Sequence, residues 1–236
     1  MNYALLLSGG KGTRTESNIP KQYVKAGGHM MITYALYTLL GNEHIDSVYI
    51  IAEQEWRDEI LSDIKGYCNN FSKIEGFVKP GSNRQESILN GLMTIVDLSD
   101  SKDDTVIIHD AARPYLSNEL LDNCYKDLAE YDGVLPVLPV KDTVYVSKDG
   151  KFISELIDRR TLYAGQSPEL FRLKSYYDAN MALLPDRIFD INGSTEPAIL
   201  NKMNIVMIQG DENNTKVTTT KDLERFKEII NESMDA

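Results

Sequence analysis

The chain has 236 residues, 42% of them hydrophobic and 26% charged, and its formal net charge at pH 7 is −11. This length and composition are typical of a soluble globular protein, and we expect a single α/β domain over residues 1–236. The acidic balance argues against nucleic-acid binding. No apolar run approaches the roughly 20 residues that a membrane span needs, and the N-terminus carries no signal-peptide pattern, so we expect a cytoplasmic protein without membrane contact.

Short apolar runs alternate with helical patterns along the chain, which is typical of βαβ units around a parallel sheet. Strands are expected over residues 4–7, 48–52, 74–78, 105–108, 134–140 and 205–208. Helices are expected over residues 30–40, 56–64, 88–96, 120–131, 173–184 and 222–230, with another short helix after Asn192. Pro136 and Pro139 predict that the strand over 134–140 is irregular or lies at an edge. The pattern predicts a Rossmann-like α/β fold, with a mostly parallel sheet flanked by helices.

A glycine-rich turn follows the first apolar run, which ends at Leu7; the turn contains Ser8, Gly9, Gly10, Lys11 and Gly12. Glycines let a ligand approach main-chain N–H groups, and several N–H groups in a row bind anions. Three cations, Lys11, Arg14 and Lys21, lie in the same stretch, which suits a triphosphate. The stretch matches neither the P-loop nor the dinucleotide fingerprint, because Thr15 replaces the third glycine of the latter. The plainer alternative is a tight connection after a strand.

Two further stretches place polar side chains next to predicted strands and helices. The segment from Pro80 to Ser87 leads into a helix, which is a natural place for a polar ligand, although Ser82 or Asn83 could be only an N-cap. Asp110 ends the strand over 105–108, where parallel sheets bind ligands, and its carboxylate suits Mg²⁺ held jointly with phosphates. Arg113 could bind a second phosphate. The alternative is a capping aspartate with a surface arginine.

An insertion is predicted at residues 141–157. Alternating polar and apolar residues flank the dipeptide Asp149-Gly150, which favours a β-hairpin over residues 142–156. A hairpin inserted into a βαβ pattern leaves the core, so its edges and its apolar face need a partner.

Together these motifs resemble the sugar-nucleotide-type cytidylyltransferases, a family that includes the methylerythritol-phosphate and ribitol-phosphate cytidylyltransferases. The family signature L-x-G-G-x-G-T-R, followed by P-K-Q, matches residues 7–14 and 20–22. Four more strings match in order, over residues 81–87, 109–114, 158–171 and 214–218, so the likeness extends from Leu5 to about Leu223. The resemblance implies a GT-A-like nucleotidyltransferase fold and a β-arm at 141–157 that crosses to the other subunit of a homodimer.

The resemblance also implies roles for individual residues. The catalytic residues would be Arg14, Lys21 and Lys216, although Lys216 by itself would pass for a solvated lysine. CTP would be bound by Leu7, Ser8, Gly9, Gly10, Gly12, Thr13, Gly81, Ser82, Arg84, Ser87, Asp110 and Ala111. The acceptor would be bound by Asp110, Arg113, Ser194 and Thr195, together with Thr143, Arg159 and Ser167 of the other subunit. Asp110 would be the ligand of Mg²⁺, and His109 a supporting residue rather than a general base.

The expected reaction joins CMP to a polyol or sugar phosphate and releases pyrophosphate from CTP. The pair Gly165-Gln166 looks more like the ribitol-phosphate branch, so D-ribitol 5-phosphate is the leading acceptor and 2-C-methyl-D-erythritol 4-phosphate the alternative. Thr195 stands where the family usually has Asp, which removes one negative charge and leaves another small polyol or sugar phosphate open.

Two other classes of function compete with this interpretation. A Rossmann dehydrogenase would need an acid about 20 residues beyond the glycine loop, and Glu53 lies too far on. A catalytically silent nucleotide-binding relative would be expected to have lost Arg14 or Lys21, and the sequence has both.

Overall fold

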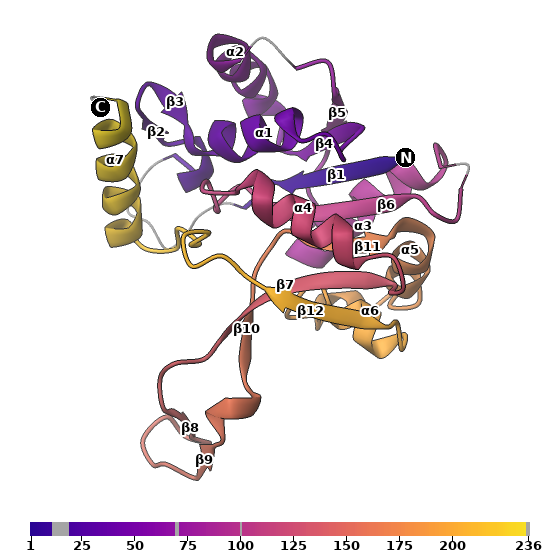
Figure 1. The fold of residues 1–236 in the computed structure, drawn as a ribbon, viewed down its shortest axis with the longest axis vertical. Helices are drawn as coiled ribbons and strands as arrows, with labels where there is room; N and C mark the ends of the chain where they lie inside the picture. Colours follow the sequence, from indigo (N-terminus) through magenta and orange to yellow (C-terminus); the bar gives the residue numbers. More distant parts are fainter. Residues whose placement is uncertain (11–18, 69–70, 100, 235–236) are drawn as a thin grey trace.

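The computed structural model describes residues 1–10, 19–68, 71–99 and 101–234. Its centre is an eight-stranded sheet with the order β10-β7-β11-β6-β1-β4-β5, and β12 pairs with β7 (Figure 1). The strands are β1 (Asn2–Leu7), β4 (Ser47–Ile51), β5 (Ile74–Val78), β6 (Thr105–Asp110), β7 (Gly133–Pro139), β10 (Tyr163–Gly165), β11 (Glu169–Arg172) and β12 (Ile205–Gln209). β5, β4, β1 and β6 run parallel, whereas β11 is antiparallel to both β6 and β7. The sheet is therefore mostly parallel, as predicted.

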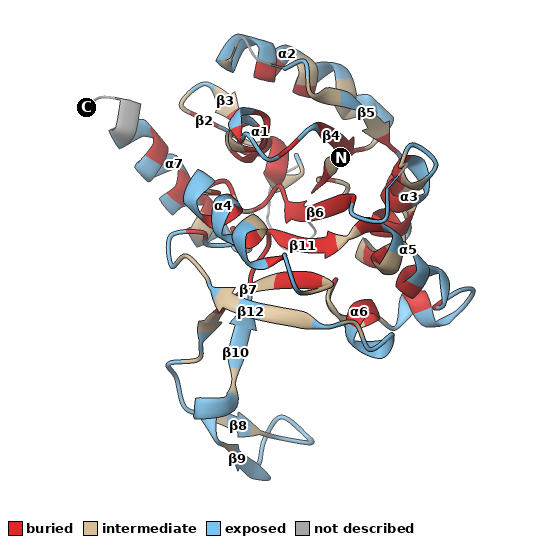
Figure 2. Ribbon diagram, turned by 45° about the vertical axis from the view of Figure 1, so that its right-hand side comes forward, coloured by how far each residue is buried: buried red, intermediate tan, exposed pale blue. Residues whose placement is uncertain are grey.

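Helices cover both faces of the sheet (Figures 1 and 2). One face carries α1 (Met31–Gly41), α2 (Arg57–Tyr67) and α4 (Asn118–Asp127), and the other carries α3 (Arg84–Val96), α5 (Leu173–Met181) and α6 (Glu196–Leu200). The last helix, α7 (Thr220–Met234), packs beside the small hairpin of β2 (Lys25–Ala26) and β3 (His29–Met30). Short 3-10 turns are formed by η1 (Lys21–Tyr23), η2 (Gln54–Trp56), η3 (Arg159–Thr161) and η4 (Arg187–Phe189). None of the described helices is long and apolar enough to cross a membrane.

The burial of β1 explains why its sequence is a continuous apolar run. Ala4 and Leu6 pack into the core under α1 and α2, whereas Tyr3 and Leu5 pack into the core under α3. Successive side chains of a strand point to opposite faces, and here helices cover both faces. Such a strand shows no polar alternation, so its apolar run is a reliable signal in the sequence.

The prediction for the strand over 134–140 was wrong about the edge, because β7 has neighbours on both sides. β12 pairs with one side, and β11 and β10 pair in succession with the other. The carbonyl oxygen of Pro136 accepts a hydrogen bond from the N–H of Gln166, in the gap between β10 and β11. The ring nitrogen of Pro136 faces the same gap, so the missing N–H interrupts no regular ladder.

The predicted arm is present as a hairpin of β8 (Val144–Val146) and β9 (Glu155–Ile157), and it projects away from the sheet (Figure 1). Its strands are shorter than the alternation suggests, and residues 147–154 connect them. Asp149 organises this connection, because its carboxylate accepts the N–H groups of Lys151 and Phe152, and Gly150 follows at φ +72°. The Asp-Gly pair therefore lies within a longer loop rather than forming a two-residue turn.

One helix boundary and one stretch of the sheet differ from prediction in ways that affect the site. Helix α3 begins at Arg84 rather than at residue 88, because the side chain of Asn83 accepts the N–H of Glu86 as an N-cap. Arg84 and Ser87 thus lie on the first helical turn. The stretch over 163–172 contains two strands, β10 and β11, that the sequence analysis did not predict, since each has only three or four residues.

Candidate active site

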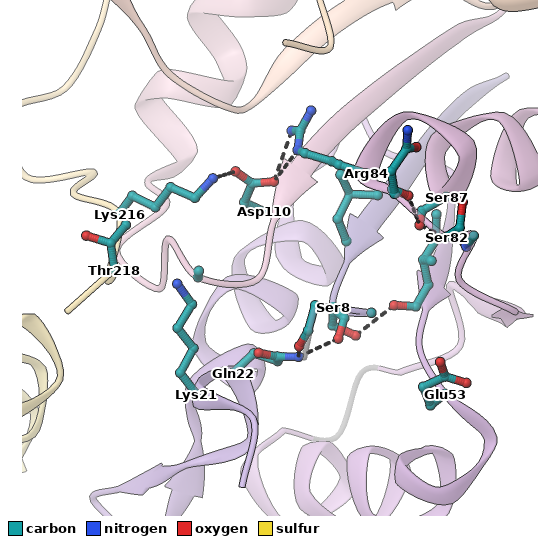
Figure 3. A pocket seen from close by; sticks show the side chains of 17 residues that line it. Ser8, Lys21, Gln22, Glu53, Ser82, Arg84, Ser87, Asp110, Lys216 and Thr218 are labelled. Atoms are coloured by element: carbon teal, nitrogen blue, oxygen red, sulfur yellow. Dashed lines mark hydrogen bonds and ion pairs between the residues drawn. The ribbon is translucent and has the colours of Figure 1, made fainter. Parts of the chain in front are cut away.

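A cavity of about 810 Å³ opens at the carboxyl ends of β1, β4 and β6 (Figure 3). Ligands of open α/β sheets bind at this edge. The cavity is lined by Leu7, Ser8, Gly9, Gly10, Lys21, Gln22, Ile51, Glu53, Gly81, Ser82, Asn83, Arg84, Ser87, Asp110, Ala112, Lys216 and Thr218. The described parts of four separate sequence motifs thus meet in one place. The sequence analysis had linked these motifs only through their resemblance to a family.

The start of the glycine-rich turn is held by two side chains of η1. Gln22 is buried, and its Nε2 donates to the carbonyl oxygens of Ser8 and Gly10 at 2.6 and 2.7 Å. The hydroxyl of Tyr23 donates to the same Ser8 carbonyl at 2.9 Å. Because a trans peptide places C=O and N–H on opposite sides, the N–H of Gly9 faces away from Gln22. The start of the turn, from Ser8 to Gly10, is therefore preorganised before a ligand binds, as an anion-binding turn requires.

The turn also packs closely against the segment that precedes α3. A Cβ atom on Gly9 would lie 2.5 Å from the ring carbons of Pro80, so only glycine fits there. On the other side, Ser87 Oγ accepts the N–H of Gly81 at 2.9 Å and donates to the carbonyl of Asn83 at 2.7 Å. These contacts shape one wall of the cavity from residues 80–87.

Asp110 lies at the centre of the charged part of the cavity. Its Oδ1 accepts from Nε and Nη2 of Arg84 at 3.1 and 3.0 Å, and its Oδ2 accepts from Nζ of Lys216 at 2.7 Å, as Figure 3 shows. Burial alone would raise the pKa of Asp110, but Arg84 and Lys216 hold that pKa well below its ordinary value. Asp110 is therefore ionised at neutral pH, and both of its oxygens are engaged by cations.

A single carboxylate fits Mg²⁺ only if phosphate oxygens and water supply the other ligands, which is how this ion is commonly held. No group of three His, Cys, Asp or Glu side chains in the described ranges could hold a metal ion. Asp110 therefore suits a metal that arrives with a triphosphate, provided that Arg84 or Lys216 gives up its contact.

Lys21 and the segment before α7 meet at the cavity. Nζ of Lys21 donates to the carbonyl oxygen of Val217 at 2.6 Å, next to Lys216 in the sequence. This contact brings both predicted catalytic lysines to one cavity, although they lie far apart in the sequence. Gly12, Thr13 and Arg14, predicted to bind CTP or act in catalysis, lie outside the described residues, as does Lys11.

Several other predicted residues lie close to the cavity without lining it. Ala111 is buried, and Ser167 Oγ accepts the N–H of Asp110 at 3.2 Å. Nη1 of Arg113 donates to the carbonyl of Asn214 at 2.5 Å, and its Nε is buried with no hydrogen-bond partner among the described residues. The hydroxyls of Ser194 and Thr195 both donate to the carboxylate of Glu169.

Thr143 lies on the arm and Arg159 lies in η3 directly after it, and both are exposed. Nη1 of Arg159 donates to the carbonyl oxygen of Lys141 at 2.5 Å, so this arginine contacts the start of the arm of its own chain. The structure thus groups the described residues among those predicted to bind CTP around one cavity, and Thr143 and Arg159 do not line it.

His109 is buried beside Asp110, with its Nε2 3.1 Å from the carbonyl oxygen of Arg113. Burial lowers the pKa of His109 to about 4, against a smaller opposing effect of the Arg113 carbonyl and Asp110. The imidazole is neutral at pH 7 and does not line the cavity, in keeping with a supporting role.

The sequence analysis missed several residues that the structure places in or near the site. Gln22, Glu53, Asn83 and Thr218 line the cavity, and Glu169 contacts Arg84 behind it. Gln22 and Thr218 lie inside strings that match the family, so the resemblance could have identified them. Glu53 follows β4, so its position after a parallel strand was a second signal. Glu169 gave no local signal, because its contacts come from distant segments.

Comparison with known proteins agrees with this geometry. Residues 3–232 match the family model described as 2-C-methyl-D-erythritol 4-phosphate cytidylyltransferase. The enzyme of that name from Lachnospira eligens is 30% identical over 228 residues, covering 95% of this chain and 96% of that protein. The one from Thermotoga neapolitana is 31% identical over 235 residues, covering 98% of each chain. The crystal structure of 4-diphosphocytidyl-2C-methyl-D-erythritol synthase from Anaerococcus prevotii shares the fold, with a TM-score of 0.80, 22% identity, and coverage of 98% of this chain and 96% of that one. This chain therefore belongs to the 2-C-methyl-D-erythritol 4-phosphate cytidylyltransferase family, whose members are nucleotidyltransferases.

Proposed function

We propose that this cytidylyltransferase transfers the CMP group of CTP to 2-C-methyl-D-erythritol 4-phosphate and releases pyrophosphate. The observation that carries the proposal is the convergence of Lys21, Arg84, Asp110 and Lys216 on one cavity in a chain of this family. The sequence analysis had ranked D-ribitol 5-phosphate first, from Gly165-Gln166. The comparisons do not support that ranking and favour the alternative acceptor.

The chemistry needs no protein nucleophile. A phosphate oxygen of the acceptor attacks the α-phosphorus of CTP, the new P–O bond forms, and the bond to the pyrophosphate oxygen breaks. The protein positions the two substrates and neutralises developing negative charge. Lys21 and Lys216 reach the cavity as cations suited to this role, and Arg14 would join them by its place in the motif.

Mg²⁺ is part of the proposal, with Asp110 as its protein ligand. The ion would neutralise charge on the phosphate oxygens. Asp110 would exchange at least one of its contacts with Arg84 and Lys216 for the ion, which frees a cation to face the phosphates.

A homodimer is also proposed, with the arm over residues 141–157 reaching the partner's cavity. Exposed apolar side chains on the arm support this, because Phe152, Ile153 and Leu156 are 75%, 67% and 62% exposed. Arg159 and Thr143 would then bind the acceptor of the neighbouring site, which explains why they lie apart from the cavity of their own chain.

The acceptor is tested by pyrophosphate release from CTP with 2-C-methyl-D-erythritol 4-phosphate and with D-ribitol 5-phosphate at matched Mg²⁺. We expect a kcat/KM at least roughly tenfold higher for the methylerythritol compound, because a site that pairs particular hydroxyls rejects a different pattern. UTP in place of CTP serves as the control for the nucleotide. A preference for the ribitol compound would overturn the acceptor, and negligible rates with both would point to a different phosphate.

A further inference from the structure

Glu169 and Asp110 lie on the same face of two neighbouring strands. In the antiparallel register of β11 and β6, Glu169 is opposite Ile108, and Asp110 is two residues further along β6. Residues two apart in a strand share a face, so the two carboxylates are diagonal neighbours. Both residues are buried, with 8% of their surface exposed. Two buried carboxylates at this spacing repel each other unless a cation lies between them or one of them binds a proton.

Arg84 is that cation. Its guanidinium donates twice to Asp110 Oδ1, and its Nη2 is also 3.9 Å from Glu169 Oε1. Arg84 is the first residue of α3, where the helix dipole disfavours a positive charge. The side chain therefore depends on acidic partners to stay at the cavity wall, and it has two.

The hydroxyls of Ser194 and Thr195 fix the orientation of Glu169. Ser194 Oγ donates to its carboxylate, and Thr195 Oγ1 donates to Oε2 at 2.9 Å. Tyr176 in turn donates to the carbonyl of Ser194 at 2.6 Å, which anchors this segment to α5. These are the two residues that the sequence resemblance assigned to the acceptor. Their hydroxyls instead hold a carboxylate that faces Arg84.

The same contacts show which acidic group lies beside Thr195. The family motif usually has Asp there, whereas in this chain a carboxylate oxygen of Glu169 lies 2.9 Å from the Thr195 hydroxyl. The carboxyl group of Glu169 therefore stands beside position 195, carried by β11 rather than by the loop before α6. Burial raises the pKa of Glu169, and Arg84 with the two hydroxyls opposes that shift.

We infer that Glu169 is a positioning residue for cytidylyl transfer: it is the counter-ion that holds Arg84 at the cavity wall, and it replaces the charge that the family motif carries at position 195. The inference rests on the proposed function. When Asp110 exchanges its bond with Arg84 for a ligand, Glu169 remains as the acidic partner of Arg84. Arg84 then stays oriented toward the nucleotide instead of turning to solvent.

The test is a charge-relocation cycle made of Glu169→Gln, Thr195→Asp and the double variant. Glu169→Gln keeps the shape and the acceptor for the two hydroxyls, but it removes the charge. We expect a loss of roughly tenfold or more in CTP affinity, measured by calorimetry, because hydrogen bonds and contacts to charged groups have about this weight. The KM for CTP should rise more than kcat falls, since Arg84 lines the nucleotide cavity.

Thr195→Asp alone should also lower the CTP affinity, because it places a second carboxylate against Glu169 and leaves Arg84 as the counter-ion of both. The double variant moves the charge from β11 to the loop and should recover CTP affinity to within about threefold of wild type. Such a reversal requires direct coupling between the two positions. The matched control is Glu224→Gln on the exposed face of α7, which should change neither affinity nor turnover.

Two results would overturn the inference: a Glu169→Gln variant that binds CTP as tightly as wild type, or a double variant whose loss equals the sum of the single losses. Thermal unfolding of each variant identifies a misfolded protein, and Glu169→Asp, which keeps the charge, then replaces Glu169→Gln. That variant should retain most of the CTP affinity, and loss of most of the affinity in a folded Glu169→Asp protein would count against the inference. Failure of the proposed function appears differently, because wild type itself would then not bind CTP or not release pyrophosphate.

Discussion

At the scale of single residues, His109 shows how burial sets a charge state beside the site. Its side chain is fully buried, its Nε2 faces the carbonyl of Arg113, and its Nδ1 has no hydrogen-bond partner among the described residues. Burial lowers the pKa of His109 from 6.5 to about 4; the Arg113 carbonyl and Asp110 oppose this shift, and the charges of the Arg113 and Arg84 guanidinium groups add to it. A neutral imidazole keeps the positive charge of the site on the lysine and arginine side chains.

This lowered pKa predicts a loss of stability in acid. Between pH 6.5 and about 4 the unfolded chain binds a proton at His109 that the folded chain does not, so the free energy of unfolding falls as the pH falls. The shift corresponds to roughly 3 kcal/mol. Urea unfolding at pH 7 and pH 4.5 should show a smaller loss in His109→Gln than in wild type. Asp110 affects the free energy of unfolding only at lower pH, below its ordinary pKa near 3.8, because its pKa is lowered in the folded chain. Equal losses in both proteins would contradict this role of His109.

At the scale of elements, the residues at the start of α3 both cap the helix and shape the wall of the cavity. The N-cap Asn83 accepts the N–H of Glu86 at 2.7 Å and donates from Nδ2 to the carbonyl of Ile188 at 3.0 Å. Because the cap sets where the helix begins, it also sets the position of Arg84 and Ser87 on the first turn. A residue that looks like an ordinary cap in the sequence therefore shapes the cavity wall as well.

Asn83→Ala should lower the free energy of unfolding by about 1 kcal/mol and also raise the KM for CTP several-fold. Ser117→Ala is the matched control, because Ser117 caps α4 by accepting the N–H of Leu120 at 3.2 Å. It should lose similar stability with no change in KM, since α4 contributes no residue to the lining of the cavity. An Asn83→Ala protein that loses stability but keeps its KM would show that the cap is structural only.

At the scale of the whole molecule, the arm is the part that a single chain leaves without a partner. The hairpin of β8 and β9 projects from the sheet, and most of its residues are exposed (Figure 2). Exposed strands with apolar side chains are covered in a stable assembly. If arms cross in a dimer, each site combines the cavity of one chain with Arg159 of the other.

Mixing two inactive variants tests this arrangement. Lys21→Ala and Arg159→Ala homodimers should each be nearly inactive, with the loss at Lys21 on the order of 10²–10³. After subunit exchange, random pairing makes half of the dimers hybrid, and each hybrid has one intact site, so about a quarter of wild-type activity should return. Exchange is verified by mass-tagged subunits. Absence of recovery in an exchanged sample would place Arg159 in the site of its own chain or in no site.

The sequence by itself was sufficient for features that depend on neighbouring residues. The apolar run of β1, the start of the glycine-rich turn after it and Asp110 at the end of β6 were all predictable, because a buried parallel strand and its carboxyl end leave a local pattern. The strings 20–22 and 214–218 pointed to Lys21 and Lys216, but only through resemblance to a family, since a single lysine carries no such information.

Only the tertiary structure decided which of these residues meet. Lys216 bonds to Asp110 across 106 positions of sequence. Glu169 accepts the hydroxyls of Ser194 and Thr195, which the family resemblance had assigned to the acceptor. The antiparallel insertion of β11 between β6 and β7 brings Glu169 to the face that carries Asp110. Strand order and register arise from packing across the whole core, so no window of the sequence contains them.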